Sequence, residues 1–343
     1  MSVEIPKSVT YIGINAFSDC QSLETVEFEN SSQLTKIESD AFRGCTSLTS
    51  ITIPASVRFI EAGAFDSCTN LREVRFASGS NLEYLSIDVF RNCQSLRTIE
   101  IPSKVKTICE RAFSYVPIEE IYIPDSVEDI EPCAFTECRS LRQVHFVGNS
   151  NLKHLTLAAF WACSNLNELI IPASVERIDE NPFVLPLLHN FGAKTIRFSH
   201  GSQLQTIGAL AFATRNLQSI SLPEGLQVIE DHAFEGCSLK EIFIPKTVNL
   251  IEDFSFLNCL KLEKIHFEEG ISPSLLIGNN AIGKAMSSFQ RYEIVPSLSR
   301  VIIPSSLKNN NYVKTFEYDL AQKDTDPISI EWVGDVLSDQ QPD

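Results

Sequence analysis

The stretch AFRGCTSLTSITIP, residues 41–54, decides the fold because close variants of it recur along the chain. The copies read AFDSCTNLREVRF at 64–76, AFTECRSLRQVHF at 134–146 and AFWACSNLNELII at 159–171. Self-similarity at a fixed period is the sequence signature of a repeat architecture, in which each repeat packs against its neighbours. The recurrence therefore indicates an array of stacked units within the 343 residues.

The phenylalanine of the AF pair, or of its variants, marks the period of the array. The markers are Phe17, Phe42, Phe65, Phe90, Phe113, Phe135, Phe160, Phe183, Phe212, Phe234 and Phe256. Most steps between them are 22 to 25 residues, which is the period of leucine-rich repeats. Two unit types alternate, because phrases such as IPASVRFI (53–60) take turns with phrases such as SSQLTKI (31–37).

Each marker is followed by an L..V.F or L..I.IP phrase, such as Leu71, Val74 and Phe76. Apolar residues two positions apart, with polar residues between them, predict a short strand with one buried face. Pro54 and its equivalents are expected to end the strand, because proline has no N–H to donate to a sheet. One strand per unit predicts a parallel sheet, and stacked units bury one another's apolar side chains in a continuous core.

The combined phrase IP.SV..I...AF..C..L..V.F resembles the BspA-like leucine-rich repeat family over residues 4–267, with a degenerate unit to residue 304. The resemblance implies a right-handed, curved solenoid of about 12 repeats with a parallel β-sheet on its concave face. It also implies a surface antigen or adhesion molecule that binds host or microbial proteins. We therefore expect a repeat array at 1–304, whose last unit at 268–304 is degenerate, and a cap strand with an acidic tail at 305–343.

The charge and hydropathy of the chain narrow the classes of partner. Lys and Arg number 28 against 44 Asp and Glu, and the resulting charge of -16 repels nucleic-acid phosphates and anionic membrane surfaces. The sequence contains no bilayer-spanning apolar stretch, and its first residues lack the pattern of a secretory signal. We expect no nucleic-acid partner and no direct membrane insertion. The missing signal and the many unpaired cysteines favour the cytoplasm, whereas the family resemblance favours the cell surface.

Eight of the ten cysteines lie three residues after a marker phenylalanine and form a predicted structural ladder. They are Cys20, Cys45, Cys68, Cys93, Cys138, Cys163, Cys237 and Cys259. Because cysteine is small, apolar and a weak donor, we expect free thiols that stack inside the coils and donate to turn carbonyls. Disulfides between neighbouring coils are the alternative in an oxidising compartment. Cys109 and Cys133 stand off the ladder. Cys133 and Cys138 have four residues between them but lack the second matched pair of a zinc site, so we predict no metal.

The sequence offers no candidate for catalysis. It has no nucleophile elbow, phosphate-binding glycine loop or dinucleotide-binding motif, and its histidines do not group at metal-ligand spacing. We therefore predict a non-catalytic, cofactor-free scaffold for an unidentified protein ligand. The alternative on the same scaffold is an intracellular protein that mediates regulatory protein–protein interactions. An enzymatic function would require a catalytic domain outside this chain.

Recognition is expected at the outward positions of the predicted strands, because side chains alternate between the two faces. The predicted contact residues of the concave face are Arg75, Tyr122, His145, Ile170, Arg197, Phe243 and His266. Aromatic and arginine side chains are enriched among the residues that dominate interfaces. The alternative is that these residues are retained for strand propensity alone. The insertion at 181–194 is expected to be an exposed contact loop or a plug folded into the coils, and the insertion at 283–296 is expected to project as a loop or a short helix.

Overall fold

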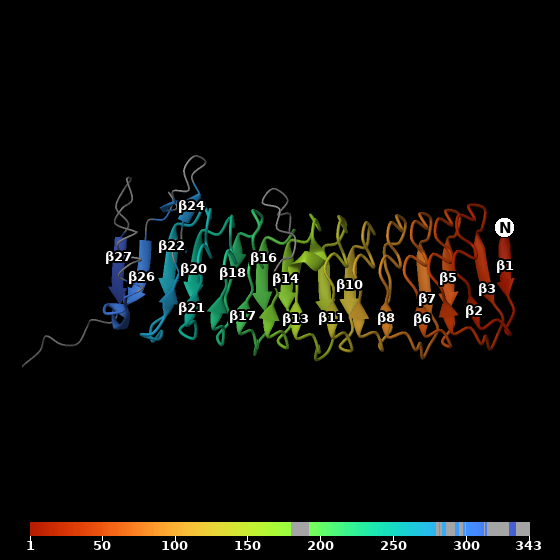
Figure 1. Cartoon of the computed structure of the whole chain (residues 1–343), viewed down its shortest axis with the longest axis horizontal. Helices are drawn as coiled ribbons and strands as arrows, with labels where there is room; N and C mark the ends of the chain where they lie inside the picture. Colours follow the sequence, from red (N-terminus) through yellow and green to blue (C-terminus); the bar gives the residue numbers. More distant parts are fainter. Residues whose placement is uncertain are drawn as a thin grey trace, which may run out of the picture. The chain divides into compact units, whose positions relative to one another are not determined.

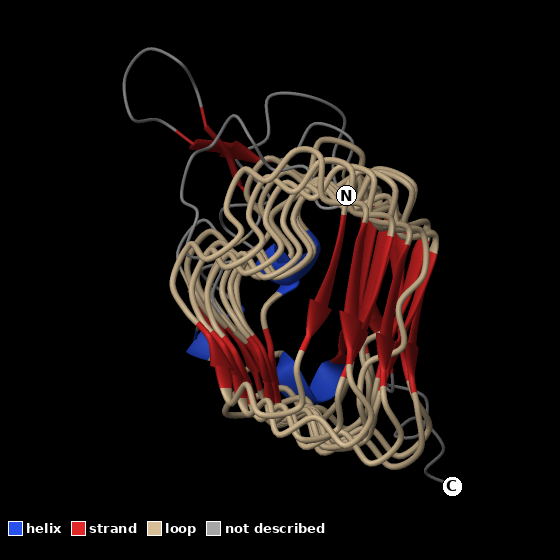
Figure 2. Cartoon of the chain, turned by 90° about the vertical axis from the view of Figure 1, so that its right-hand side faces the viewer, coloured by secondary structure: helices blue, strands red, loops and turns tan. Residues whose placement is uncertain are grey.

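The computed structural model describes residues 1–179, 192–278, 281, 283–285, 292–294, 298, 300–311, 313 and 329–333. Two compact units divide the chain, Met1–Ser174 with Asn190–Ala193, and Val175–His189 with Lys194–Asp343. Each unit consists of successive turns that contribute one strand to each of two opposite sides, and Figures 1 and 2 show this arrangement. The predicted fold class is confirmed, since the chain is a parallel β-solenoid of about 11 turns with almost no helix.

The first unit carries its longer strands on one side of the turns. They are β1 (Ser2–Ile5), β3 (Thr25–Phe28), β5 (Ser50–Ile53), β7 (Glu73–Phe76), β10 (Glu120–Ile123), β12 (Gln143–Phe146) and β14 (Glu168–Ile171). Two-residue strands occupy the other side: β2 (Tyr11–Ile12), β4 (Lys36–Ile37), β6 (Phe59–Ile60), β8 (Tyr84–Leu85), β9 (Thr107–Ile108), β11 (Asp129–Ile130) and β13 (His154–Leu155). In one coil a short 3-10 helix, η1 (Leu157–Phe160), stands where the other described coils have a hydrogen-bonded reverse turn. We call the solvent-facing surfaces of these two sets the long-strand face and the short-strand face.

The second unit repeats this arrangement. Its long-strand face is built by β16 (Thr195–Phe198), β18 (Ser219–Ile220), β20 (Glu241–Ile244), β22 (Lys264–Phe267), β26 (Arg300–Pro304) and β27 (Ser329–Val333). Its short-strand face is built by β15 (Arg177–Ile178), β17 (Thr206–Ile207), β19 (Val228–Ile229), β21 (Leu250–Ile251) and β23 (Leu276–Ile277). A second 3-10 helix, η2 (Ser305–Leu307), follows β26.

The two predicted insertions lie largely outside the described residues. In 283–296, the strands β24 (Gly283–Ala285) and β25 (Tyr292–Ile294) pair antiparallel, and the other residues are not described. In 181–194, only residues 192–194 are described.

The marker phenylalanines form the centre of both units. In the first unit the rings of Phe17, Phe42, Phe65, Phe90, Phe113, Phe135 and Phe160 stack in sequence order with centroids 5.2 to 5.7 Å apart. In the second unit Phe212, Phe234 and Phe256 stack at 5.2 Å. Leucine, isoleucine and valine from each turn surround the rings and are buried. The sequence repeat therefore exists because each ring needs an equivalent ring in the next turn to exclude water.

Strand pairing on the long-strand face alternates between complete and partial. Complete four-residue registers join β1 to β3, β5 to β7, β10 to β12 and β20 to β22. Only one residue pair joins β3 to β5, and only two join β16 to β18. After a complete pair the next residue still donates, as Ala77 N does to the Ile53 carbonyl at 2.9 Å. Pro54 stands at that position directly after β5, and Pro223 stands three residues after the end of β18. Neither proline has an N–H to donate to the preceding turn.

Candidate functional site

The cysteine ladder lies inside the turns. Seven thiols donate to the carbonyl of a marker phenylalanine in the preceding turn at 3.0 to 3.2 Å, namely those of Cys45, Cys68, Cys93, Cys138, Cys163, Cys237 and Cys259. All ten cysteines are free thiols. Burial raises the pKa of Cys45 to about 12 and that of Cys109 to about 11, which disfavours the nucleophilic thiolate at neutral pH. This arrangement suits packing and hydrogen bonding rather than chemistry.

The described part of the chain has no group of three or more His, Cys, Asp or Glu side chains placed to hold a metal ion. Within the same residues, no helix has the length and apolar character needed to cross a membrane.

The predicted contact residues lie at outward positions of the long strands. Arg75 is on β7, Tyr122 on β10, His145 on β12 and Ile170 on β14 in the first unit, and Arg197 is on β16, Phe243 on β20 and His266 on β22 in the second. Tyr122 is 51% exposed and Phe243 is 50% exposed, whereas both histidines are half-buried. The Nε of Arg75 lies 2.7 Å from a carboxylate oxygen of Glu73, so this arginine is paired on its own strand. The structure therefore brings the aromatic residues, and not Arg75, into clusters.

The first cluster joins Tyr122 and His145, which are register neighbours on β10 and β12. Their rings stack with centroids 4.5 Å apart and an interplanar angle of 15°. A carboxylate oxygen of Glu120 lies 3.7 Å from His145 Nε2 and accepts a hydrogen bond from the Tyr122 hydroxyl at 3.4 Å. The Tyr122 ring, the exposed member of this cluster, therefore lies beside the negative charge of Glu120.

The second cluster joins Phe243 and His266, which are register neighbours on β20 and β22. Their ring centroids are 5.0 Å apart, and the ammonium of Lys264 lies 5.7 Å above the Phe243 ring. Partial burial lowers the pKa of His266, and the charges of Lys264 and Arg300 lower it further. Arg300 is also ion-paired with Glu331 on β27. The Phe243 ring therefore lies beside the positive charge of Lys264, while Glu331 and Glu241 partly offset the positive charges around His266.

The two clusters occupy equivalent positions in equivalent strand pairs. The sequence signal is an EIYIP or EIFIP strand followed one turn later by a VHF or IHF strand. Sequence reasoning named the four ring residues singly, but it missed that they pair. It also missed Glu120, Lys264 and Arg300 as their neighbours. Pairing depends on the register between turns, which a list of outward positions does not contain.

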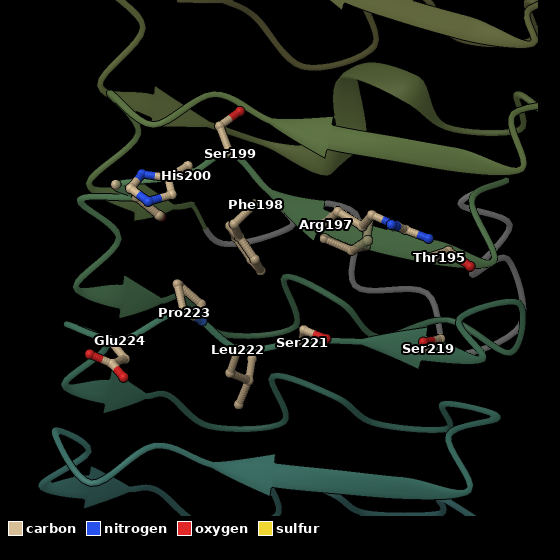
Figure 3. Close-up of a pocket in the computed structure, with 13 residues that line it drawn as sticks. Thr195, Arg197, Phe198, Ser199, His200, Ser219, Ser221, Leu222, Pro223 and Glu224 are labelled. Carbon is tan, nitrogen blue, oxygen red and sulfur yellow. The ribbon is translucent and has the colours of Figure 1, made fainter.

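Arg197 belongs to a groove instead of a ring cluster. Where β16 and β18 separate, a groove of about 740 Å³ opens, and we call it the Arg197 groove. Its lining includes Arg197, Phe198, His200, Ser221, Leu222 and Glu224. Figure 3 shows Arg197 with Thr195 toward one end of the groove and Glu224 with Pro223 toward the other. Phe198 and Leu222 are half-exposed, so the groove combines apolar surface with hydroxyl and charged groups.

A sequence model of the BspA type leucine rich repeat region, built on six copies of the repeat, matches residues 1–115, 79–185 and 188–314. The chain belongs to the BspA-type leucine-rich repeat family. The resemblance in the repeat phrase is thereby confirmed.

Several solved structures are similar to this BspA-type chain. A leucine rich cell surface protein from Faecalibacterium prausnitzii A2-165 is 31% identical over 78% of this chain and 79% of that chain, with a TM-score of 0.43. The pneumococcal vaccine antigen PcpA is 24% identical over 88% of this chain and 67% of that chain, with a TM-score of 0.47. A leucine-rich repeat protein from Bacteroides ovatus ATCC 8483 is 22% identical over 97% and 92%, with a TM-score of 0.48. No curated protein matches the chain.

Proposed function

We propose that the chain is a non-catalytic scaffold that binds a protein partner through its long-strand face. The observation that carries this proposal is the recurrence of a half-exposed aromatic ring packed on an imidazole, Tyr122 on His145 and Phe243 on His266. Aromatic side chains dominate the energy of protein interfaces because they bury much surface at little entropic cost. A partner that covers these rings removes their remaining exposed half from water.

The charges around the two rings favour different partner groups. Glu120 beside Tyr122 favours a basic or hydrogen-bond-donating group of the partner. The ammonium of Lys264 over the Phe243 ring favours an acidic group. Each unit therefore offers its own exposed aromatic ring, and the charge beside the ring differs between the two units.

The Arg197 groove adds a concave element to the second unit. Its volume of about 740 Å³ lies within the roughly 300–1,000 Å³ of sites that enclose small ligands. Ser219 and Ser221 supply hydroxyl groups, which can accept hydrogen bonds, on one wall. A side chain of the bound partner that carries an N–H group fits this wall.

The test compares two single variants, Tyr122→Ala and Phe243→Ala. The wild-type chain is used to isolate partners without bias, and the affinity of each recovered partner is then measured for every variant. We expect at least about a tenfold loss of affinity at each position. Thermal stability is expected to stay unchanged, because both rings are half-exposed. Phe59→Ala, an equally exposed ring on the short-strand face, is the matched control. Unchanged affinity of both variants for a confirmed partner contradicts the proposal.

Membership of the BspA-type family supports the finer proposal that the chain is a surface antigen or adhesion protein for host or microbial proteins. A specific observation favours a second candidate, a regulatory interaction protein in a reducing compartment. Seven ladder thiols act as S–H donors inside the core, and oxidation of any of them removes that hydrogen bond. Protease treatment of intact cells separates the two candidates, since a surface protein is cleaved and an internal one is protected.

We also propose that residues 305–343 cap the array. The strand β27 pairs with β26 through five residue pairs, from Arg300 with Ser329 to Pro304 with Val333. A paired strand satisfies the backbone groups of β26 that would otherwise form an exposed edge. Removal of residues 305–343 is expected to cause concentration-dependent aggregation, which light scattering detects.

A further inference from the structure

The two strand pairs that carry the ring clusters match at three of their four outward positions. Each pair has a glutamate, an exposed ring and an imidazole there, namely Glu120, Tyr122 and His145 in the first unit and Glu241, Phe243 and His266 in the second. The fourth position, next to the glutamate, is Gln143 in the first unit and Lys264 in the second. The two clusters therefore differ by one cation.

In the second unit the cation at the fourth position contacts the ring. The ammonium of Lys264 lies 5.7 Å from the centroid of the Phe243 ring. At this distance the negative face of an aromatic ring attracts a cation. Gln143 is neutral and makes no such contact, so the first unit repeats the arrangement of glutamate, ring and imidazole without the charge that Lys264 supplies.

A second carboxylate stands next to Tyr122 in the preceding turn. The Glu119 amide donates to the Arg97 carbonyl at 3.3 Å, and this alignment places Glu100 at the outward position beside Tyr122. Neighbouring strands lie about 4.8 Å apart, so the exposed Glu100 side chain reaches the side of the Tyr122 ring that faces away from His145. The ring therefore has a carboxylate on its own strand, Glu120, and a second one in the turn before.

The chain itself does not balance these two charges. In the part of the chain that the structure describes, neither Glu100 nor Glu120 forms an ion pair with a lysine or an arginine. Two arginines of the preceding turns are already paired with other carboxylates, Arg75 with Glu73 at 2.7 Å and Arg97 with Glu119 at 3.4 Å. We call Glu100, Glu120, Tyr122 and Gln143 the cation site.

We propose that the cation site binds an arginine side chain of the protein partner, which supplies to Tyr122 the charge that Lys264 supplies to Phe243. This contact rests on the proposed function, since it belongs to the same long-strand face. A guanidinium is flat, stacks on aromatic rings and donates several N–H groups to carboxylates, whereas an ammonium is compact and more strongly hydrated. The imidazole of His145 already stacks on Tyr122 at an interplanar angle of 15°, so a flat nitrogen-bearing group fits this ring. Arginine is therefore expected to bind better than lysine.

The experiment is an NMR titration of the full chain with Nα-acetyl-arginine amide, a probe that carries a single guanidinium. We expect saturable shifts of the backbone amides of β10, β12 and Glu100. Nα-acetyl-lysine amide should bind about threefold more weakly, because its ammonium is more strongly hydrated. Nα-acetyl-citrulline amide has nearly the same shape without the charge and should bind roughly tenfold more weakly. Added salt should weaken the binding of the arginine probe, because the carboxylates are exposed.

Gln143→Lys is the decisive variant, because it gives the first unit the lysine that the second unit carries at this position. The new ammonium should occupy the ring and the carboxylates and should weaken binding of the arginine probe at least about tenfold. Ser50→Lys adds the same charge at the equivalent outward position of β5. It is the matched control and should bind the probe like the wild type.

Three results overturn the cation site: shifts that do not include β10 and β12, equal binding of the citrulline probe, and unchanged binding by Gln143→Lys. A protein partner separates this inference from the proposed function. Loss of its affinity in both Tyr122→Ala and Gln143→Lys supports the two together. Loss in Tyr122→Ala alone supports the partner-binding face and overturns arginine as the anchor.

Discussion

Phe65→Ala is the substitution that most directly tests whether the stacked phenylalanines hold the turns together. The Phe65 ring is fully buried and stacks on Phe42 at 5.3 Å and on Phe90 at 5.6 Å. Phe17, at the start of the ladder, is half-buried and has one stacked neighbour, Phe42, at 5.2 Å. The two positions carry the same side chain in the same kind of turn, so they differ mainly in burial and in the number of stacked partners.

The expected losses follow from these differences. Removal of a fully buried phenylalanine side chain costs about 3–5 kcal/mol, of which a part arises from the cavity left behind. We expect about 4 kcal/mol for Phe65→Ala, because rings on both sides hold the cavity open. Phe17→Ala loses about half of the buried area and one aromatic contact and leaves no enclosed cavity, so we expect about 1–2 kcal/mol.

Urea unfolding followed by circular dichroism measures both losses, and hydrogen exchange locates them. Since each turn of a solenoid contacts only its neighbours, Phe65→Ala should increase exchange mainly in the turns that carry Phe42 and Phe90. Phe65→Leu retains much of the side-chain volume and should recover more than half of the loss. Equal losses at Phe65 and Phe17, or increased exchange spread evenly over the chain, would refute the ladder as the source of stability.

Three further substitutions test other parts of the structure. Burial raises the pKa of Cys45 from 9.0 to about 12, so the neutral thiol stabilises the fold fully below about pH 8.5, and this stabilisation is lost as the pH rises toward 12. The free energy of urea unfolding should therefore fall with pH in that range, and Cys45→Ala should make this fall less steep. Asp66→Ala removes a buried carboxylate that pairs with Arg91 at 3.1 Å and with Arg43 at 3.5 Å, and it should lower the unfolding free energy by about 2 kcal/mol. As the control, Glu73→Ala removes an exposed ion pair with Arg75 and should lower the unfolding free energy by less than about 0.5 kcal/mol. Gly192→Ala would place a Cβ 1.7 Å from the Cys163 carbonyl oxygen and should lower the unfolding free energy by about 3 kcal/mol. Gly79→Ala is the control, because its left-handed backbone has open space around it, and it should lower the unfolding free energy by about 1 kcal/mol.

The fold could be predicted from the sequence because each fixed letter of the repeat has one place in the stack. Phe42 stacks, Leu48 fills the core beside it, and Pro54 ends the strand, so period and residue type together determine the turn. The arrangement of outward side chains could not be predicted in this way. Whether Tyr122 meets His145 depends on the register between two turns, and register is determined by backbone hydrogen bonds that the repeat phrase does not specify.

The Arg197 groove shows a second limit of sequence reasoning. A proline after a predicted strand indicates the end of that strand, but β18 already ends at Ile220, three residues before Pro223. The groove needs an additional condition, namely that the preceding strand β16 continues to Phe198 while β18 stops at Ile220. The two ends then diverge, and the space between them is lined by residues from both turns. A single turn's sequence contains only one half of that geometry.

The short-strand face was overlooked because its strands contain two residues each, too few for an alternation pattern to be recognised. A signal was nevertheless present, since Tyr11, Phe59 and Tyr84 each directly precede the apolar residue that ends the phrase. Each turn of a solenoid has outward positions on two opposite sides of one core. A residue change at an outward position on one side therefore leaves the side chains on the other side unchanged. In the first unit Tyr122 lies on the long-strand face and Phe59 on the short-strand face. Among the short strands of the first unit, β2, β6 and β8 carry an exposed ring, whereas β4 carries Lys36 and β9 carries Thr107 at the same position. The core uses the same buried positions in every turn, and it therefore leaves two separate sets of side chains, one on each side of the turn, in contact with solvent.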